Sequence, residues 1–344
     1  MTSSVATATT IRAPVNQTLA FVGYHLQAGV DHMFLYFDDP RDPSTPRLRD
    51  VSRVTCVSCS ESHWKERGIS PSAPVQTKQM SNATEAFHRA REAGYEWLVH
   101  LDSDELLHAT IPLRQLAAHS PAQADALVFP TKEAVPQQLH YERPFRDIEL
   151  FKYDPSHHLL QGNVLGSDLQ HRARGLLART WRYRRQFVER IGYAYPSVLD
   201  SFLLGHTNGK AATRTSVPIQ KIGNHRPKMD GERQLRVYTL QRGAVLHFDC
   251  MGYDRWRQKW KRRVEGAAHF NTERFRPDRK RVRQMFETAA QAGEEALRTL
   301  YRRMYVLAPT QRILLRSLGL VERIALSDEC VAWNFPDARR TDGP

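Results

Sequence analysis

The sequence has few cysteines, no long apolar run and no recognisable export signal. Its four cysteines in 344 residues fit a reducing compartment better than a disulfide scaffold. No segment offers the roughly 20 consecutive apolar residues of a spanning helix, and the mean hydropathy is −0.56. These absences argue against disulfide-rich modules and against membrane channels or transporters. We expect a cytoplasmic protein, either free or peripheral at a membrane.

The ends of the chain differ from its middle. Residues 1–10 are rich in Ser, Thr and Ala but lack the basic start and apolar core of a secretory signal. They predict a short disordered tail. We expect one α/β domain over residues 11–250 and a basic helical segment over residues 251–344.

Cys56 and Cys59 form a C-x-x-C pair inside a strand-like run. A zinc site would need a second cysteine or histidine pair nearby, and none follows in the sequence. Buried structural thiols are therefore favoured over a metal or redox role.

Positive charge is in excess, with 50 Lys and Arg against 37 Asp and Glu and a formal net charge of +13. Such a balance predicts an anionic partner. Nucleotide phosphates, an anionic lipid surface, an acidic glycan and nucleic acid all qualify, and charge alone does not choose among them.

Strand-like and helix-like segments alternate through the first half, which is typical of an α/β sheet. After residue 251 the pattern is helical and basic. The segments predicted as strands are 11–15, 32–37, 51–59, 97–101 and 125–130, and those predicted as helices are 17–28, 78–93, 253–268, 278–305 and 309–325.

An acidic motif follows the apolar run WLVHL. Asp102, Ser103 and Asp104 come directly after this predicted strand, and the carboxyl ends of strands are where open α/β sheets bind ligands. Two carboxylates at i and i+2 suit a hard divalent cation that bridges to substrate phosphates. The alternative is a solvated turn that caps the next helix.

Residues 96–107, EWLVHLDSDELL, resemble the "W-hydrophobic-D-x-D-E-F/L" block of family-2-like glycosyltransferases. Residues 21–39, FVGYHLQAGVDHMFLYFDD, are similar to that family's early block "W-x-x-Y-H-x-x-x-G-V-D-H-x-x-x-Y-D-N-N". A looser match is carried by Gly209-Lys210, Arg214, His225-Arg226-Pro227 and Leu246-His247-Phe248. The resemblance spans about residues 14–265. It implies a GT-A fold (a Rossmann-like mixed sheet flanked by helices), a nucleoside-diphosphate-sugar donor, and Mn²⁺ or Mg²⁺.

The same resemblance implies roles for individual residues. Asp102 and Asp104 would hold the metal, with His247 completing its shell, and Ser103 and Asp38 would approach the donor. His225 is the second histidine that can take the place of His247, and a core or surface histidine is the alternative for both.

Two basic residues, Lys210 and Arg214, lie in or near a Gly-containing loop. They would clamp the diphosphate, with Arg binding phosphate oxygens bidentately. A solvated loop is the competing interpretation.

An inverting transferase also needs a carboxylate base that deprotonates the acceptor hydroxyl. The candidates are Asp104 and, in the loop-rich region after the acidic motif, Asp147 and Glu149. Ordinary solvated carboxylates are also expected in that region.

The sequence departs from the family pattern at Gln17, where members carry Glu, which leaves open a glycosyltransferase-like pseudoenzyme. Basic runs at 172–190 and 255–263 contain aromatic residues, including Trp256 and Trp260. Packing of those tryptophans on the core, contact with an anionic membrane and nucleic-acid binding are the three interpretations. Nucleic-acid binding is the least favoured because it leaves the acidic motif without a use. The predicted function is transfer of a sugar to a hydroxyl of a glycan, lipid-linked glycan or polysaccharide.

Overall fold

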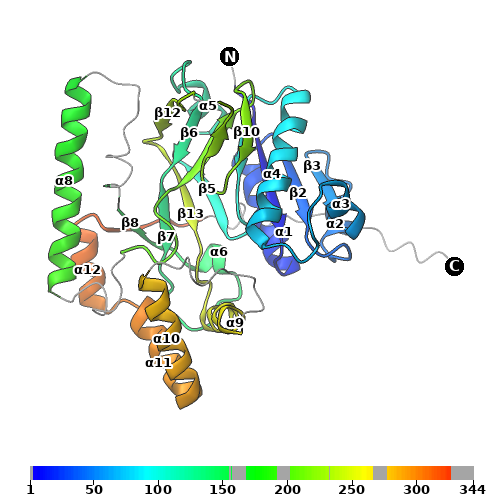
Figure 1. Cartoon of the computed structure of the whole chain (residues 1–344). Coiled ribbons are helices and arrows are strands. Elements are labelled where there is room, and N and C mark those ends of the chain that lie inside the picture. The colour runs from blue at the N-terminus through cyan, green and yellow to red at the C-terminus, as the bar shows by residue number, and fades with distance from the viewer. Residues whose placement is uncertain are drawn as a thin grey trace.

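The computed structural model describes residues 3–154, 156, 168–191, 202–231, 233–265 and 277–326. It has a mixed α/β architecture (Figure 1), as predicted. A seven-stranded sheet has the order β12-β6-β9-β4-β1-β2-β3, and a five-stranded sheet has the order β14-β8-β7-β13-β5. A two-stranded hairpin, β10-β11, completes the strands of the described residues.

The larger sheet is parallel at β1, β2, β3 and β4, whereas β9 runs antiparallel to both β4 and β6. Its strands are β1 (Val5–Ile11), β2 (His32–Phe37), β3 (Val54–Ser58), β4 (Trp97–His100), β6 (Ala126–Phe129), β9 (Lys210–Arg214) and β12 (Val237–Thr239). The remaining strands are β5 (Glu105–Ala109), β7 (Thr131–Ala134), β8 (Leu150–Tyr153), β10 (Ile219–Ile222), β11 (Pro227–Met229), β13 (Gly243–His247) and β14 (Val321–Arg323).

Helices lie on both faces of the larger sheet. The helices are α1 (Val15–Gln27), α2 (Thr45–Leu48), α3 (Glu61–Glu66), α4 (Val75–Glu92), α5 (Leu113–Ala118), α6 (Pro144–Asp147), α8 (Asp168–Arg190), α9 (Tyr253–Val264), α10 (Pro277–Ala292), α11 (Glu294–Tyr305) and α12 (Pro309–Ser317). In β2, Met33 and Leu35 join the core under α1, whereas Phe34 and Tyr36 pack under α4. The strand is apolar throughout because both of its faces are buried.

The first ten residues are a correction to the prediction. Residues 5–10 belong to β1, at the centre of the larger sheet, and each of them is buried. The sequence VATATTI is only weakly apolar, which is why the strand was not predicted. Thr7 and Thr9 are nevertheless buried within it.

The segment after residue 251 is not purely helical. β14 pairs with β8, so the chain returns to the smaller sheet after α12. Residues 327–344, also part of the predicted helical segment, lie outside the described residues. Trp256 and Trp260 are buried with α10 and α11, which supports the packing interpretation of these tryptophans.

Candidate active site at the carboxyl ends of the parallel strands

A cleft of about 510 Å³ opens where β1, β2 and β4 end. Parallel strands bring their carboxyl ends to one edge of a sheet, so loops distant in sequence meet there. The cleft is lined by Thr10, Arg12, Ala13, Pro14, Gln17, Asp38, Val75, Gln76, Lys78, Gln79, Asp102, Ser103, Asp104, Gly205, His206, Asn224, His225, His247, Phe248, Asp249, Met251, Arg255, Gln258, Lys259, Arg262 and Arg263.

Asp102 is already engaged on both carboxylate oxygens. Gln79 donates to Oδ1 at 2.6 Å, and the ammonium of Lys210 lies 2.9 Å from Oδ2. Burial lowers the pKa of Lys210, but the carboxylates of Asp102 and Glu105 more than compensate, so the net pKa is raised and the side chain is a permanent cation. Asp102 is therefore a fixed anion in the floor of the cleft.

Glu105, the first residue of β5, is the buried centre of the site. Its Oε2 lies 2.9 Å from Lys210 Nζ and accepts the backbone N–H of Asp102, and its Oε1 lies 2.8 Å from His206 Nε2. Burial would raise the pKa of Glu105, yet Lys210 and His206 hold it well below the usual value. The carboxylate stays ionised although no part of it reaches solvent.

Three histidines pack together beside Glu105. The ring centroids of His206 and His225 are 4.4 Å apart, and those of His206 and His247 are 4.7 Å apart. Burial lowers the pKa of His206 and lowers that of His225 to about 4, so both imidazoles are neutral at pH 7. One ligand atom each of Glu105, His206 and His247 lies within 4.8 Å of the others, which forms a potential metal centre.

Gly205 leaves the space that the His247 ring occupies. A Cβ at residue 205 would lie 2.5 Å from His247 Nδ1, so a larger residue collides with the ring. Within the described residues this buried Nδ1 has no hydrogen-bond partner.

Asp104 differs from Asp102 in its surroundings. It is half-buried and lines the cleft, and no hydrogen bond or ion pair to its carboxylate occurs among the described residues. Burial raises its pKa, Asp102 and Glu105 add to the rise, and His247 and Lys259 oppose it. Asp104 is thus the acidic residue of the motif whose oxygens are available to a ligand.

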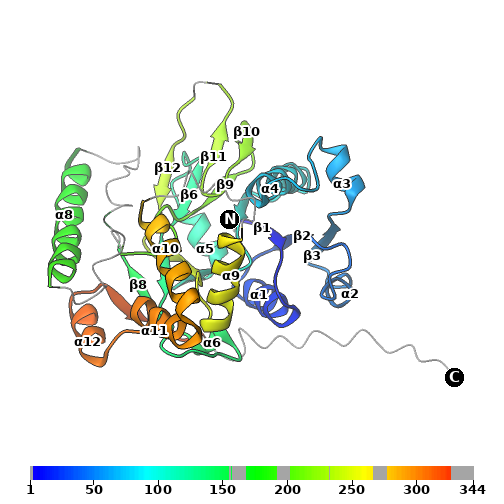
Figure 2. The same cartoon turned by 60° about the horizontal axis from the view of Figure 1, so that its bottom comes forward.

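Helix α9 forms the basic wall of the cleft. Figure 2 shows it between α1 and the pair α10 and α11. Positions three and four apart on a helix share a face. One face of α9, with Tyr253, Trp256 and Trp260, is buried against α10 and α11. The opposite face lines the cleft with Arg255, Gln258, Lys259, Arg262 and Arg263.

Ion pairs and hydrogen bonds connect this wall to the rest of the site. Arg255 contacts Gln17 of α1, and Gln17 Nε2 donates to the carbonyl of Ser103 at 2.9 Å. Lys259 Nζ lies 2.8 Å from Asp249 Oδ1. Burial would raise the pKa of Asp249, but Lys259 and His247 lower it below the ordinary range.

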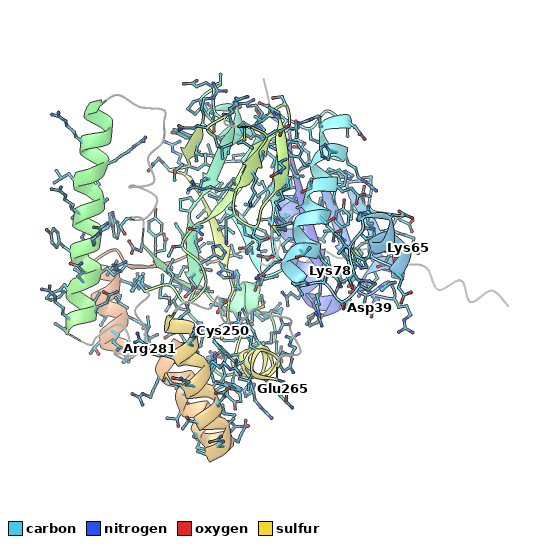
Figure 3. All side chains as sticks on the ribbon, viewed as in Figure 1. Asp39, Lys65, Lys78, Cys250, Glu265 and Arg281 are labelled. Carbon is cyan, nitrogen blue, oxygen red and sulfur yellow. The ribbon has the colours of Figure 1, made fainter. Side chains whose placement is uncertain are left out.

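The predicted donor residue Asp38 lies at the cleft, directly after β2. Lys78, at the amino end of α4 (Figure 3), holds its Oδ1 at 3.1 Å, and Arg12 approaches the other oxygen at 3.9 Å. Ser103 also lines the cleft. Lys210 lies beneath its floor, where it is bound to the carboxylates rather than exposed to a ligand.

The structure does not bring Arg214, Asp147 and Glu149 to the cleft. Arg214 lies at the far end of β9, paired with Glu96 and over the Trp97 ring, because β9 runs antiparallel to β4. Asp147 is exposed and accepts the backbone N–H of Arg143, and Glu149 pairs with Arg323.

Sequence reasoning missed His206, Gln79, the central position of Glu105 and the cleft-facing side of α9. The i, i+4, i+7 and i+8 spacing of Arg255, Lys259, Arg262 and Arg263 was a usable signal for that wall. No local pattern marks His206, which meets Glu105 across 101 positions of the chain.

Comparisons with known proteins give distant relatives of the chain. No protein-family model matches the chain. Two Arabidopsis thaliana proteins, both named glycosyltransferase-like, are each 24% identical to it over 261 residues, which is 70% of this chain. The matched region is 46% of one relative and 52% of the other, so the chain spans about half the length of the curated relatives it matches. The names of these two relatives specify no donor, acceptor or metal.

Two solved structures match part of the chain. S. aureus TarS 1-349 is 14% identical with a TM-score of 0.28, covering 40% of this chain and 40% of that one. HddC from Yersinia pseudotuberculosis is 13% identical with a TM-score of 0.25, covering 42% of this chain and 67% of that one. Similarity at this level carries no argument about fold or function.

Proposed function

We propose that the chain is a glycosyltransferase of the GT-A type that moves a sugar from a nucleoside-diphosphate-sugar donor to a hydroxyl of a glycan or lipid-linked acceptor. One observation carries the proposal. Asp102 and Asp104, the acidic centre at the strand ends, face the basic wall of α9 across a single cleft. Carboxylates suit a divalent cation, and arginines suit the oxygens of a diphosphate.

The residues at the acidic centre fit Mn²⁺ or Mg²⁺. Carboxylate oxygens and neutral imidazole nitrogens are donors that Mn²⁺ accepts, and His247 has a buried ring nitrogen without a partner in the described part of the chain. In the proposal, Asp104 and His247 hold the cation. Asp102 would join them through a second lone pair of an oxygen that also contacts Gln79 or Lys210. A bound cation would neutralise charge that grows on the departing diphosphate.

The donor would lie between the strand ends and α9. Arg255, Arg262 and Arg263 line the cleft and would supply phosphate contacts, and Asp38, which pairs with Lys78, would accept hydrogen bonds from the nucleoside. Burial lowers the pKa of Arg255 while Asp104 raises it, so this guanidinium remains charged beside the acidic motif.

A second candidate, a nucleotide-sugar-binding protein without metal-dependent transfer, is favoured by Lys210. Its ammonium lies between Asp102 and Glu105 and already compensates two of the carboxylates that a cation would use. In this second candidate the diphosphate is held by α9 alone.

Thermal unfolding with nucleoside diphosphates, in the presence and absence of Mn²⁺, tests the proposal. A ligand that binds only the folded chain raises its unfolding midpoint. We expect a midpoint increase that requires Mn²⁺ and that disappears in Asp104→Asn. The control is Asp147→Asn, which removes one exposed carboxylate outside the cleft.

The outcomes separate the two candidates. Stabilisation that is equal with and without Mn²⁺, together with no turnover of sugar nucleotides, supports the second candidate. If no nucleoside diphosphate shifts the midpoint under either condition, the donor assignment is wrong.

A further inference from the structure

Helix α8 displays an apolar stripe on the outer surface of the molecule. The exposed fractions are 67% for Leu176, 69% for Tyr183 and 52% for Phe187, with 47% for Ile191 just after the helix. Residues 176, 183 and 187 are seven and eleven positions apart, which places them on one face of a helix. Figure 1 shows α8 at the edge of the molecule, with α12 beside its lower end.

Arginines follow this stripe along the helix. The helix contains seven arginines against two acidic residues. Arg172, Arg179 and Arg190 are exposed, and at 100° per residue they fall on the flank of the Leu176–Phe187 face. The exposed side of α8 is therefore both apolar and strongly basic.

The opposite side of α8 fixes the helix in this orientation. Val188 is fully buried with Leu315 and Leu320, and Trp181 packs against the same cluster. Arg184 donates to the carbonyl of Leu318 at 3.1 Å. Turning the apolar stripe inward would break these contacts, so the stripe faces outward as part of the fold.

We infer that α8 is a docking surface for a bilayer of anionic phospholipids. A helix with apolar and aromatic residues on one face, flanked by arginines, lies in the plane of a membrane interface. The apolar stripe enters the acyl boundary while the arginines bind headgroup phosphates. Within the described residues no helix is long and apolar enough to cross a membrane.

The positive charge of α8 favours an anionic bilayer as its partner over a second copy of this chain. A two-fold contact through α8 would set arginines against arginines, because both partners present the same surface. An anionic surface compensates them. Trp256 and Trp260 are not part of this surface, since both are buried. Docking through α8 does not depend on the proposed transferase activity.

Co-sedimentation of the full chain with phosphatidylcholine vesicles, with and without phosphatidylserine, tests the inference. We expect binding that requires phosphatidylserine and weakens with salt. Arg179→Gln/Arg190→Gln should lower the partition coefficient about 30-fold, at about fivefold for each arginine near the surface. Tyr183→Ser/Phe187→Ser should lower it at least about tenfold by removing apolar area.

The control is Lys65→Gln/Lys280→Gln, which removes two exposed positive charges elsewhere and should leave vesicle binding within about twofold. Thermal unfolding of each variant shows whether it is folded. Equal loss in the control would make the effect one of net charge and overturn the inference. Failure of the wild-type chain to bind phosphatidylserine vesicles would also overturn it, as would α8-dependent binding to an oligonucleotide or an acidic protein in place of vesicles.

Discussion

The ammonium of Lys210 lies 2.9 Å from Asp102 Oδ2 and 2.9 Å from Glu105 Oε2. The lysine is fully buried, so one cation joins β9, the end of β4 and the start of β5. This contact places the acidic motif relative to the strands on either side. The motif is thus part of the buried charge network of the fold as well as part of the cleft.

Lys210→Met should strongly destabilise the protein. Removal of one partner from a buried charge network leaves the other charges without compensation, which costs about 3–5 kcal/mol. Urea unfolding measures the loss. Lys210→Met/Glu105→Gln, which also removes one of the two carboxylates left without a cation, should recover part of the lost stability. A Lys210→Met chain as stable as the wild type would contradict the network.

Gly205→Ala should distort the histidine cluster. The new Cβ would lie 2.5 Å from His247 Nδ1, and overpacking of this kind costs about 1–3 kcal/mol. The Mn²⁺-dependent rise in the unfolding midpoint should be lost as well. Gly205→Ala/His247→Ala separates the two effects: removing the ring should restore stability but not the response to Mn²⁺. A response that survives in the double variant would exclude His247 as a ligand.

Local sequence patterns predicted several strands of the larger sheet. The strand at 32–37 is as expected, and the run before Asp102 ends at the cleft, because continuous apolar residues identify buried strands without knowledge of the rest of the chain. The pairing of distant segments was beyond such patterns. Lys210 was expected at a diphosphate and instead lies beneath the floor of the cleft, since β9 inserts between β4 and β6.

The same strand explains why Arg214 was misplaced. Lys210 and Arg214 are four residues apart and were predicted as one phosphate clamp in a loop. They occupy opposite ends of β9, and the antiparallel register brings Arg214 opposite Trp97, at the start of β4. Two residues four positions apart can converge on one phosphate in a loop. In an extended strand the same two residues lie well apart along the strand.

The cleft-facing side of α9 should contribute to nucleotide affinity. Arg262→Gln should raise the dissociation constant of a nucleoside diphosphate about tenfold, the value of one charge-assisted hydrogen bond to phosphate. Isothermal titration at two salt concentrations measures it. Arg257→Gln is the matched control, because Arg257 is an exposed arginine of the same helix that does not line the cleft and pairs with Glu294. Equal weakening by both variants would show that only overall charge matters.

His25 should make stability depend on pH below neutrality. Its Nδ1–H donates to the carbonyl of Phe21 at 2.8 Å, and its Nε2 accepts the backbone N–H of Leu107 at 3.1 Å, so the neutral ring ties α1 to β5 behind the acidic motif. Burial lowers the pKa of His25 from 6.5 to about 4, although the Phe21 carbonyl and Glu105 oppose the change.

The unfolded chain therefore takes up a proton near pH 6.5, whereas the folded ring resists protonation down to about pH 4. Stability from this residue is complete above pH 6.5 and is lost as pH falls toward 4, by about 3 kcal/mol in total. Urea unfolding at pH 7.5, 6, 5 and 4, measured for the wild type and His25→Gln, should show a shallower decline in the variant, because glutamine does not titrate. His119→Gln, at an exposed site, should retain the wild-type slope. Identical slopes for His25→Gln and the wild type would mean that the His25 ring is not kept neutral by the fold.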